Sequence, residues 1–276
     1  MPDNYFSNYT PDFSINDKDR LVVELSRTHL ACMTVHEDKQ AISGFELYTF
    51  SADEAKHPED IIDHVWANSK LVNKKRTGTH IYINDEYCVP VPVMKFDEAL
   101  AESYLDMVSG PDYDAEVRHE HLTVMPCIMN VYRINRNCLE ILEHKFPGAT
   151  YHHTYSHIIK RAMGDTDDGD VISLRLYKEF FIVTVQKGGE LQLIQTFPYK
   201  TKEDVLYHLM NISNQLELRR EQLRLRLSGL VEINDQLYKD LQSHFNLITD
   251  DVSSAQFSGG NGHPSHYFAP FINLGS

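Results

Sequence analysis

Two regions of the chain alternate short apolar runs with polar breaks. Residues 21–50 read LVVELSRTHLACMTVHEDKQAISGFELYTF, and residues 171–199 read VISLRLYKEFFIVTVQKGGELQLIQTFPY. Runs rich in β-branched and aromatic residues, bounded by polar positions, are typical of short strands joined by tight turns. The predicted turns lie near Ser26–Thr28, Glu37–Lys39, Tyr177–Lys178 and Lys187–Gly189. Each region therefore predicts a meander of three strands, and Thr34–Val35 matches Thr184–Val185 at an offset of 150.

A similar helix sequence follows each meander. Residues 59–70 read EDIIDHVWANSK, and residues 203–214 read EDVLYHLMNISN, at an offset of 144. In the second copy the apolar side chains recur with helical spacing, at Val205, Leu209, Ile212 and Leu216. This spacing places them on one helical face, which can cover a sheet.

The polar residues of these helices have structural explanations. Thr201 is the predicted N-cap of the second helix, and Pro58 suits the first turn of the first helix. The Glu-Asp pair that opens each copy is favoured by the positive end of the helix dipole. His64 and His208 occupy matching positions beside the apolar stripe, so we expect half-buried structural histidines.

The repetition continues beyond the helices. THIYIND (79–85) predicts a strand and FDEALAESYLDMV (96–108) a helix, and their counterparts are LRLRLSG (223–229) and INDQLYKDLQSHF (233–245). Aligning Asp97 with Asn234, the predicted cap of the later helix, gives an offset of 137. Pro90 and Pro92 exclude the stretch between 85 and 96 from a central strand. We predict an α/β fold with two duplicated β-β-β-α-β-α domains and mixed sheets.

The segments outside the repeats complete the predicted organisation. Residues 121–134 and 149–153 are strand candidates, and 136–146 and 156–163 are helix candidates. GDTDDGD (164–170) has the composition of a linker. We therefore expect a first domain with an N-terminal extension over residues 1–165 and a second domain over 166–276. The tail from 252 is loop-like, and YFAPFINL within it is a candidate edge strand.

Composition and charge narrow the classes of partner. The formal net charge is −14, which disfavours binding to nucleic acid or to an anionic membrane surface. The N-terminus lacks a basic and then apolar secretory signal, and the apolar runs are too short to cross a bilayer. The 4 cysteines form no CxxC pair, so we expect buried free thiols. These features predict a cytoplasmic protein without membrane insertion.

Several segments together resemble a known family. They are VVELSRTHLACMTV, VISLRLYKEFFIVTVQKGGELQLIQTFPYKTKEDVLYHL and LRLSGLVEINDQLYKDL. Over roughly residues 17–248 the chain resembles an uncharacterised bacterial family, a domain of unknown function with an actin-like ATPase (ribonuclease-H-like) fold. The same superfold is used by pilus and secretion-assembly proteins as a cytoplasmic scaffold. The resemblance implies that turns after the first strand of each domain would hold nucleotide phosphates.

The residues at those implied turns depart from the family's pattern of an acid followed by glycine and hydroxyl residues. The first copy has Glu24, Ser26, Arg27 and Thr28, and the second has Leu174-Arg175-Leu176-Tyr177-Lys178, without acid or glycine. The adenosine-contacting turn is reduced to Gly229 and its neighbours. If a nucleotide binds, Glu24, Ser26, Arg27, Thr28 and Gly229 are the residues expected to meet ATP and Mg²⁺.

Two functional hypotheses follow. The first, which we favour, is a non-catalytic scaffold that binds an unidentified protein partner, or a second copy of itself as a homo-oligomer. It assigns no catalytic residue and requires no cofactor. The alternative is a degenerate nucleotide binder or slow ATPase, ATP hydrolysis being the one reaction with support.

Metal binding is a weaker hypothesis, prompted by 15 histidines. His119 and His121 would share one strand face, and His153 and His157 would share a face if their segment were helical. No complete metal-binding spacing is present, so no metal ligand is assigned.

Overall fold

The computed structural model describes residues 4–11, 13–36, 41–51, 58–74, 76, 78–164, 169–219, 223–257 and 262–275. The chain divides into two compact units, one of Met1–Lys160 with Gly275 and one of Arg161–Leu274 with Ser276. The boundary expected after residue 165, most of the linker at 164–170 and the turn at Glu37–Lys39 lie outside the described residues.

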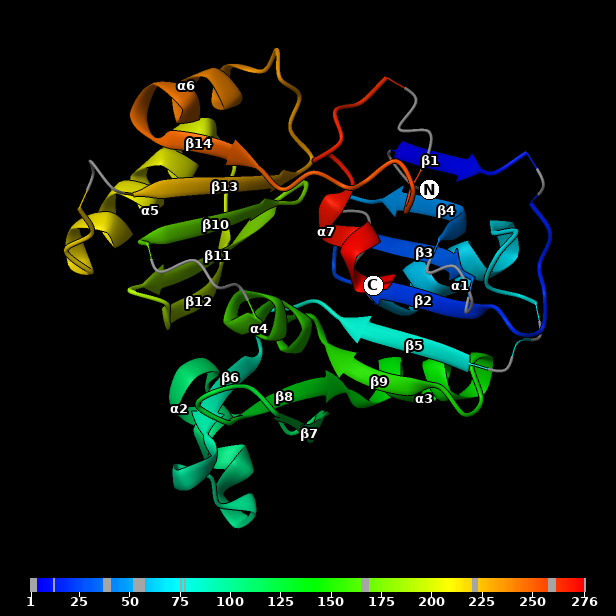
Figure 1. The fold of residues 1–276 in the computed structure, drawn as a ribbon. Helices are drawn as coiled ribbons and strands as arrows, with labels where there is room; N and C mark the ends of the chain where they lie inside the picture. The colour runs from blue at the N-terminus through cyan, green and yellow to red at the C-terminus, as the bar shows by residue number, and fades with distance from the viewer. Residues whose placement is uncertain are drawn as a thin grey trace. The chain divides into compact units, whose positions relative to one another are not determined.

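The first unit is built on a six-stranded sheet with the order β1-β4-β3-β2-β5-β9 (Figure 1). Its strands are β1 (Asn4–Tyr9), β2 (Arg20–Leu25), β3 (His29–Val35), β4 (Ile42–Thr49), β5 (Gly78–Ile83) and β9 (Thr150–His153). β1, β4, β3 and β2 pair antiparallel, whereas β2, β5 and β9 run parallel. Helix α1 (Pro58–Asn68) packs on β3 and against α3 (Arg136–Lys145). The sheet is therefore mixed, as predicted.

The second unit repeats this plan with five strands in the order β12-β11-β10-β13-β14. They are β10 (Val171–Leu176), β11 (Phe180–Lys187), β12 (Glu190–Pro198), β13 (Arg224–Gly229) and β14 (Asn246–Thr249). β12, β11 and β10 form the antiparallel meander, and β13 and β14 add to it in parallel. Helix α5 (Lys202–Gln215) packs against α6 (Gln236–His244). The predicted duplication is confirmed.

Pairing register shows that the two copies align at an offset of 151 rather than the 150 expected. Arg20 pairs with Val35 and Gly78, and Val171 pairs with Gln186 and Arg224. The register also shifts at equivalent places, between Thr34 and Val35 and between Val185 and Gln186. A single chance match of Thr-Val pairs misled the sequence alignment, because a slip of one residue is visible only in the strand pairing.

The prediction that residues 96–108 form the second helix of the first copy is wrong. Helix α2 (Ala101–Ser109), preceded by a 3₁₀ turn at Glu98–Leu100, packs on β6 (Cys88–Pro92), β7 (Ala115–Leu122) and β8 (Ile128–Asn135). These strands form a separate sheet with the order β6-β8-β7. The helix that leads into the parallel strand β9 is α3, so α3 and β9 match α6 and β14. Neighbouring parallel strands need a crossover connection, and α3 supplies it.

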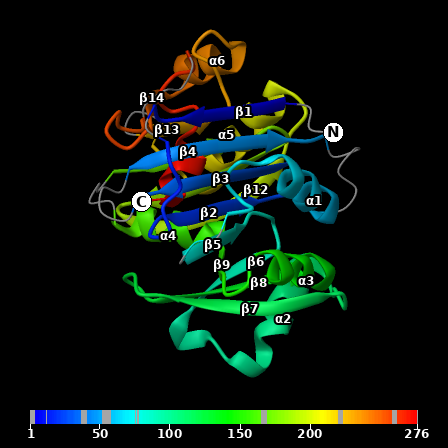
Figure 2. The same cartoon turned by 90° about the vertical axis from the view of Figure 1, so that its right-hand side faces the viewer.

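Residues 88–135, here called the insert, therefore interrupt the first copy between β5 and α3. Figure 2 shows the insert beyond the edge of the first sheet formed by β5 and β9. Its core contains Val91, Ala101, Leu105 and Val131. The single strand expected over residues 121–134 is the end of β7 plus β8. Pro90 and Pro92 lie in β6, an edge strand, as expected.

Local predictions in the second unit are largely confirmed. Gly188 and Gly189 form the second turn with φ of 58° and 78°. Thr201 caps α5 and forms a capping box with Asp204. The predicted face of α5 is buried in the core of this unit. The cap of α6 is Asp235 rather than Asn234.

Both ends of the chain differ from expectation. The N-terminal extension contributes β1, an edge strand that pairs with β4. The candidate edge strand in the tail is instead helix α7 (Ala269–Ile272) followed by a 3₁₀ turn (Asn273–Gly275). Helix α4 (Thr154–Gly164) begins in the first unit and ends in the second. Within the described ranges, no helix is both long and apolar enough to span a membrane.

Candidate functional site

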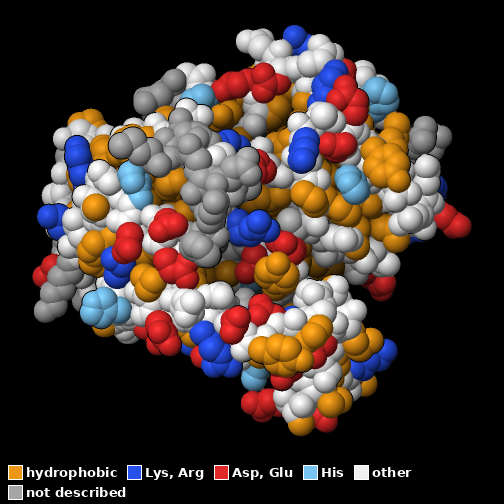
Figure 3. Space-filling model, turned by 180° about the vertical axis from the view of Figure 1, so that it is seen from behind, with side chains coloured by type: hydrophobic (Ala, Val, Ile, Leu, Met, Phe, Trp, Pro, Cys, Tyr) orange, Lys and Arg blue, Asp and Glu red, His pale blue; other side chains and the backbone are white. Residues whose placement is uncertain are grey.

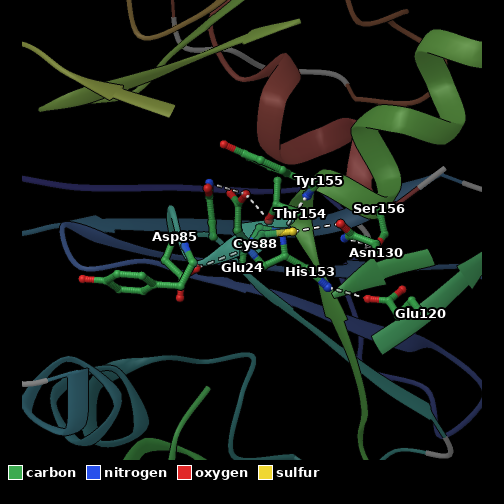
Figure 4. A network of polar contacts seen from close by, with 11 residues as sticks. Glu24, Asp85, Cys88, Glu120, Asn130, His153, Thr154, Tyr155 and Ser156 are labelled. Carbon is green, nitrogen blue, oxygen red and sulfur yellow. Dashed lines mark hydrogen bonds and ion pairs between the residues drawn. The ribbon is translucent and has the colours of Figure 1, made fainter. Parts of the chain in front are cut away.

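The carboxyl ends of β2, β5 and β9 meet at one edge of the first sheet, where parallel α/β folds place ligands. Glu24 lies near the end of β2, and its side chain is 1% exposed. Its Oε1 accepts hydrogen bonds from Asn84 Nδ2 at 2.8 Å and Thr154 Oγ1 at 3.1 Å. Its Oε2 lies 3.3 Å from His29 Nε2. The carboxylate is thus held by groups from three elements, and Figure 4 shows Glu24 beside one of them, Thr154.

The turn after β2 is closed by the side chain of Ser26. Ser26 Oγ accepts hydrogen bonds from the backbone N–H groups of Thr28 at 3.1 Å and His29 at 3.0 Å. It also lies 2.7 Å from His29 Nδ1, and the Ser26 N–H donates to the His29 carbonyl at 2.9 Å. A phosphate-binding turn presents its N–H groups to the ligand. In this turn those of Ser26, Thr28 and His29 donate within the hairpin, and Arg27 is the residue whose side chain is exposed.

The polar network extends from this edge toward the insert. His153, fully buried at the end of β9, accepts from the Tyr155 N–H through Nδ1 at 3.1 Å. Its Nε2 therefore carries the proton and faces Asp85 Oδ1 at 3.3 Å. The His153 N–H donates to Glu120 Oε1 at 2.7 Å. Strand β9 is thereby tied both to the end of β5 and to strand β7 of the insert.

A second branch joins the insert to the start of α4. Cys88 Sγ donates to Asn130 Oδ1 at 2.9 Å, and Asn130 Nδ2 donates to Ser156 Oγ at 2.8 Å (Figure 4). Burial raises the pKa of the Cys88 thiol well above its ordinary value. The thiol is therefore a protonated donor and not a nucleophile.

A cavity of about 440 Å³ lies beside the closed turn, in the first unit. It is bordered by the turn after β2, the N-terminal ends of α1 and α3, and the insert. Its charged lining residues are Arg27, Glu59, Asp85, Asp112 and Arg133. Arg133 is already engaged, because it pairs with Asp106 and donates to the Gly110 carbonyl at 2.7 Å. The remaining charged side chains of the lining are acidic apart from Arg27, and acidic side chains repel a triphosphate.

Gly229, the fifth residue of the nucleotide hypothesis, lies in the second unit at the end of β13. Its φ is +106°, and a Cβ there would lie 2.0 Å from the Leu176 carbonyl oxygen. Glycine is therefore required by the close approach of β13 to β10. The turn after β10 is filled by the buried Tyr177 ring, stacked on Phe180 with centroids 4.6 Å apart.

The corrected offset also changes which residues correspond. An offset of 150 matches Glu24 with Leu174, but the strand register places Arg175 at the position equivalent to Glu24. A buried acid in the first unit is thus replaced by a buried arginine in the second. Sequence reasoning missed this exchange because the alignment was one residue out of register.

The histidines divide into structural and unexpected positions. His64 lies beside Tyr48 and Phe50, and His208 beside Phe181 and Phe197, so both are half-buried, as predicted. His153 ends β9 and does not share a helix face with His157, contrary to expectation. No group of three or more metal-ligating side chains is found in the part of the chain that the structure describes.

The cysteines and a histidine pair add two further points. Cys32, Cys88 and Cys138 are buried free thiols, as expected, whereas Cys127 is exposed. His80 and His152 stack, with Nδ1 of His80 3.1 Å from Nε2 of His152. Sequence analysis missed this pair because it depends on the parallel pairing of β5 with β9.

Comparisons with known proteins bear on the family and the fold. The family described as "Protein of unknown function (DUF3822)" matches residues 9–248. No curated protein matches the chain. A Bacteroides thetaiotaomicron protein with actin-like ATPase fold and unknown function matches 94% of this chain and 96% of its own, with TM-score 0.78 and 14% identity. The PilM-PilN type IV pilus biogenesis complex matches 94% of this chain and 98% of its own, with TM-score 0.61 and 12% identity. These likenesses establish the actin-like ATPase fold predicted from the sequence.

Proposed function

The chain belongs to the DUF3822 family of unknown function and has an actin-like ATPase fold, and from this premise we propose that it is a non-catalytic scaffold binding a protein partner. The proposal keeps the cytoplasmic placement expected from the sequence. It is supported by the closed turn after β2, whose N–H groups are already hydrogen-bonded, and by the surface of the insert. The surface of the insert is the main observation behind the proposal.

The insert exposes a concentration of large apolar side chains. Of 9 large hydrophobic residues that are exposed among those described, 6 belong to the insert: Met94, Leu100, Met107, Val108, Tyr113 and Met125. Figure 3 shows hydrophobic side chains mixed with charged ones on the lobe at the bottom of that view. Methionine and tyrosine are enriched in protein interfaces, and methionine adapts its shape to a partner. A surface of this composition is typical of a protein-binding site.

The similar PilM-PilN structure supports a protein as the occupant. That structure is a biogenesis complex of PilM with PilN, so a protein of this fold assembles there with a protein partner. At 12% identity this is an analogy of fold. It supports a protein-binding role for this chain but does not identify the partner. We infer that a protein partner contacts α2 and the turns around it.

Affinity purification of the tagged full chain from its own cells tests this role. Met107 is 85% exposed, so Met107→Glu should leave the fold intact, checked by circular dichroism. We expect partner recovery to fall by at least about tenfold, because the loss of one interface residue can weaken binding by that factor. The matched control is Tyr207→Glu, which introduces the same charge at an exposed position of α5 in the second unit.

The two variants separate the outcomes. A protein recovered with the wild type and with Tyr207→Glu, but not with Met107→Glu, supports the proposal. Equal recovery with both variants contradicts it. Recovery of a second copy of the chain as the sole specific partner would replace it with the homo-oligomer hypothesis.

Nucleotide binding remains the alternative proposal, with Glu24, Ser26, Arg27, Thr28 and Gly229 as contacts for ATP and Mg²⁺. Arg27 favours it, being a cation exposed on the turn. The hydrogen bonds of Glu24 and Ser26 within the first unit favour the scaffold instead. Arg27→Ala separates the two, because only a nucleotide binder would lose phosphate-release activity while keeping its stability.

A further inference from the structure

Helix α2 of the insert presents one apolar face to solvent. Ala101 and Leu105 turn inward and lie in the core of the insert. Leu100, just before the helix, and Met107 are seven positions apart, so they share another face. These two side chains are 48% and 85% exposed. This face of α2 is therefore left uncovered by the described chain.

The helix is held in place at both ends. The Tyr104 hydroxyl donates to the Lys95 carbonyl at 2.9 Å, which ties the preceding turn to the helix. At the other end, Arg133 pairs with Asp106 and donates to the Gly110 carbonyl at 2.7 Å. A surface that is ordered before binding loses less conformational entropy when a partner arrives. The exposed face of α2 is thus already formed in the free chain.

Acidic side chains accompany the apolar ones along this stretch. Residues 94–114 contain six acids and one cation, Lys95. Glu98, Glu102 and Asp106 recur every four positions, so they form a row along the helix. Figure 3 shows acidic side chains among the hydrophobic ones on the lobe at the bottom of that view. The apolar face of α2 is therefore bordered by negative charge.

The chain itself neutralises one of these six acids. Arg133 pairs with Asp106. Within the described ranges no salt bridge involves the other five, which are Asp97, Glu98, Glu102, Asp112 and Asp114. Asp97 and Asp112 accept hydrogen bonds from the backbone N–H groups of Ala99 and Asp114, both at 3.0 Å, but these donors carry no net charge. Five negative charges thus stand against the single positive charge of Lys95.

This charge selects among the possible occupants of the surface. A second copy of the chain would bring the same acidic border against itself, and a nucleic acid or an anionic membrane would also bring like charge. A basic partner is attracted instead, and its apolar side chains can cover Leu100 and Met107. Two helices that lie side by side bury rows of side chains spaced three and four apart, as on α2.

We propose that the partner of the insert presents a basic amphipathic helix. Its apolar face packs on the exposed face of α2, and its lysine or arginine side chains meet Glu98, Glu102 and the other acids of the border. The inference rests on the proposed function and adds the chemistry of the partner to it.

Binding of designed peptides to the full chain tests this partner class. The probe is a labelled peptide of about 18 residues, five helical turns, with leucine on one face and lysine on the other. Two matched peptides carry glutamate in place of lysine, or serine in place of leucine. By fluorescence anisotropy, we expect the leucine–lysine peptide to bind at least about tenfold more tightly than either. Equal binding of either matched peptide would overturn the proposal.

Charge reversal locates the peptide site on the chain. Glu98→Lys combined with Glu102→Lys should weaken binding of the leucine–lysine peptide by at least about tenfold and strengthen binding of the leucine–glutamate peptide. A misfolded variant would not produce that gain. Glu140→Lys combined with Glu190→Lys is the matched control, because it changes the net charge equally at exposed positions of α3 and β12. Equal responses of the two double variants would overturn the proposal.

The same double variants in the affinity purification separate this inference from the proposed function. Loss of the native partner with Met107→Glu and with the Glu98/Glu102 double variant, but not with the control, supports both. Loss with Met107→Glu and full recovery with the Glu98/Glu102 double variant keeps the proposed function and refutes the basic helix. Full recovery with Met107→Glu refutes the proposed function and this inference with it.

Discussion

Glu24, which the nucleotide hypothesis places at a phosphate turn, lies in a buried hydrogen-bond network of the first unit. Its carboxylate is buried and holds His29, Asn84 and Thr154, which come from β3, the end of β5 and the start of α4. A buried carboxylate with these partners organises the edge of the sheet from within. The carboxylate therefore joins three elements of the first unit.

Removing this carboxylate should destabilise the fold. We expect Glu24→Ala to lower the free energy of unfolding by about 3 kcal/mol, because the partner groups stay buried without an acceptor. Urea unfolding measures the change. Glu86→Ala, the loss of an exposed acid nearby, should remain within about 0.5 kcal/mol of the wild type. Similar small effects for both variants would show that the network contributes little.

The stacked pair of His80 and His152 should make stability depend on pH. Burial lowers the pKa of His80, and the charge of His152 lowers it further. The unfolded chain binds a proton near the ordinary pKa of about 6.5, whereas folded His80 resists it. The contribution is therefore present above that pKa and lost as pH falls below it.

Replacing His80 tests this dependence. We expect His80→Gln to lose less stability than the wild type when urea unfolding is compared between about pH 7 and about pH 5.5. Parallel losses in the two proteins would rule out the pair as a source of the pH dependence.

At the scale of elements, close strand packing explains a residue that sequence reasoning assigned to a ligand. Gly229→Ala should cost about 3 kcal/mol or more, since its Cβ would overlap the Leu176 carbonyl at a positive φ. Gly188→Ala has a positive φ but open space, so about 1 kcal/mol is expected. Chemical denaturation compares the two. Equal costs would show that strain alone, without strand packing, accounts for the glycine.

The sequence predicts elements well where periodicity and turn chemistry agree. The two meanders, α1 and α5, and the capping box at Thr201 follow from local patterns. Strand β1 gives no such signal, because its polar residues lie at an exposed sheet edge. The tail mimics a strand in composition, yet Pro270 stands in the first turn of α7.

Features that depend on contacts between distant residues could not be predicted from the sequence. The pattern of residues 96–108 matches that of 233–245, but only strand pairing shows that α2 belongs to the insert and α3 to the repeat. The candidate site depends on the same pairing, since Glu24, Asn84 and Thr154 are far apart in the chain.

At the scale of the whole molecule, the duplicated fold persists although its sequence has diverged. A structure that matches with TM-score 0.78 shares 14% of its residues with this chain. Core positions tolerate such change if apolar volume and pattern are kept. The two turns that the resemblance implies as phosphate sites are filled by Ser26 in one unit and Tyr177 in the other.

A scaffold function predicts different roles for the repeats and the insert. The repeats provide buried sheets, while the insert exposes six of the large apolar side chains. Partner binding should therefore respond to changes in the insert more than to changes at either turn.

The central claim is that neither turn binds a nucleotide. A thermal-shift titration of the intact chain with Mg-ATP, Mg-ADP and Mg-GTP tests this claim most directly. We predict that none of the three nucleotides raises the melting temperature of the chain in a saturable way. A saturable shift with any of them that Arg27→Ala abolishes would contradict the account.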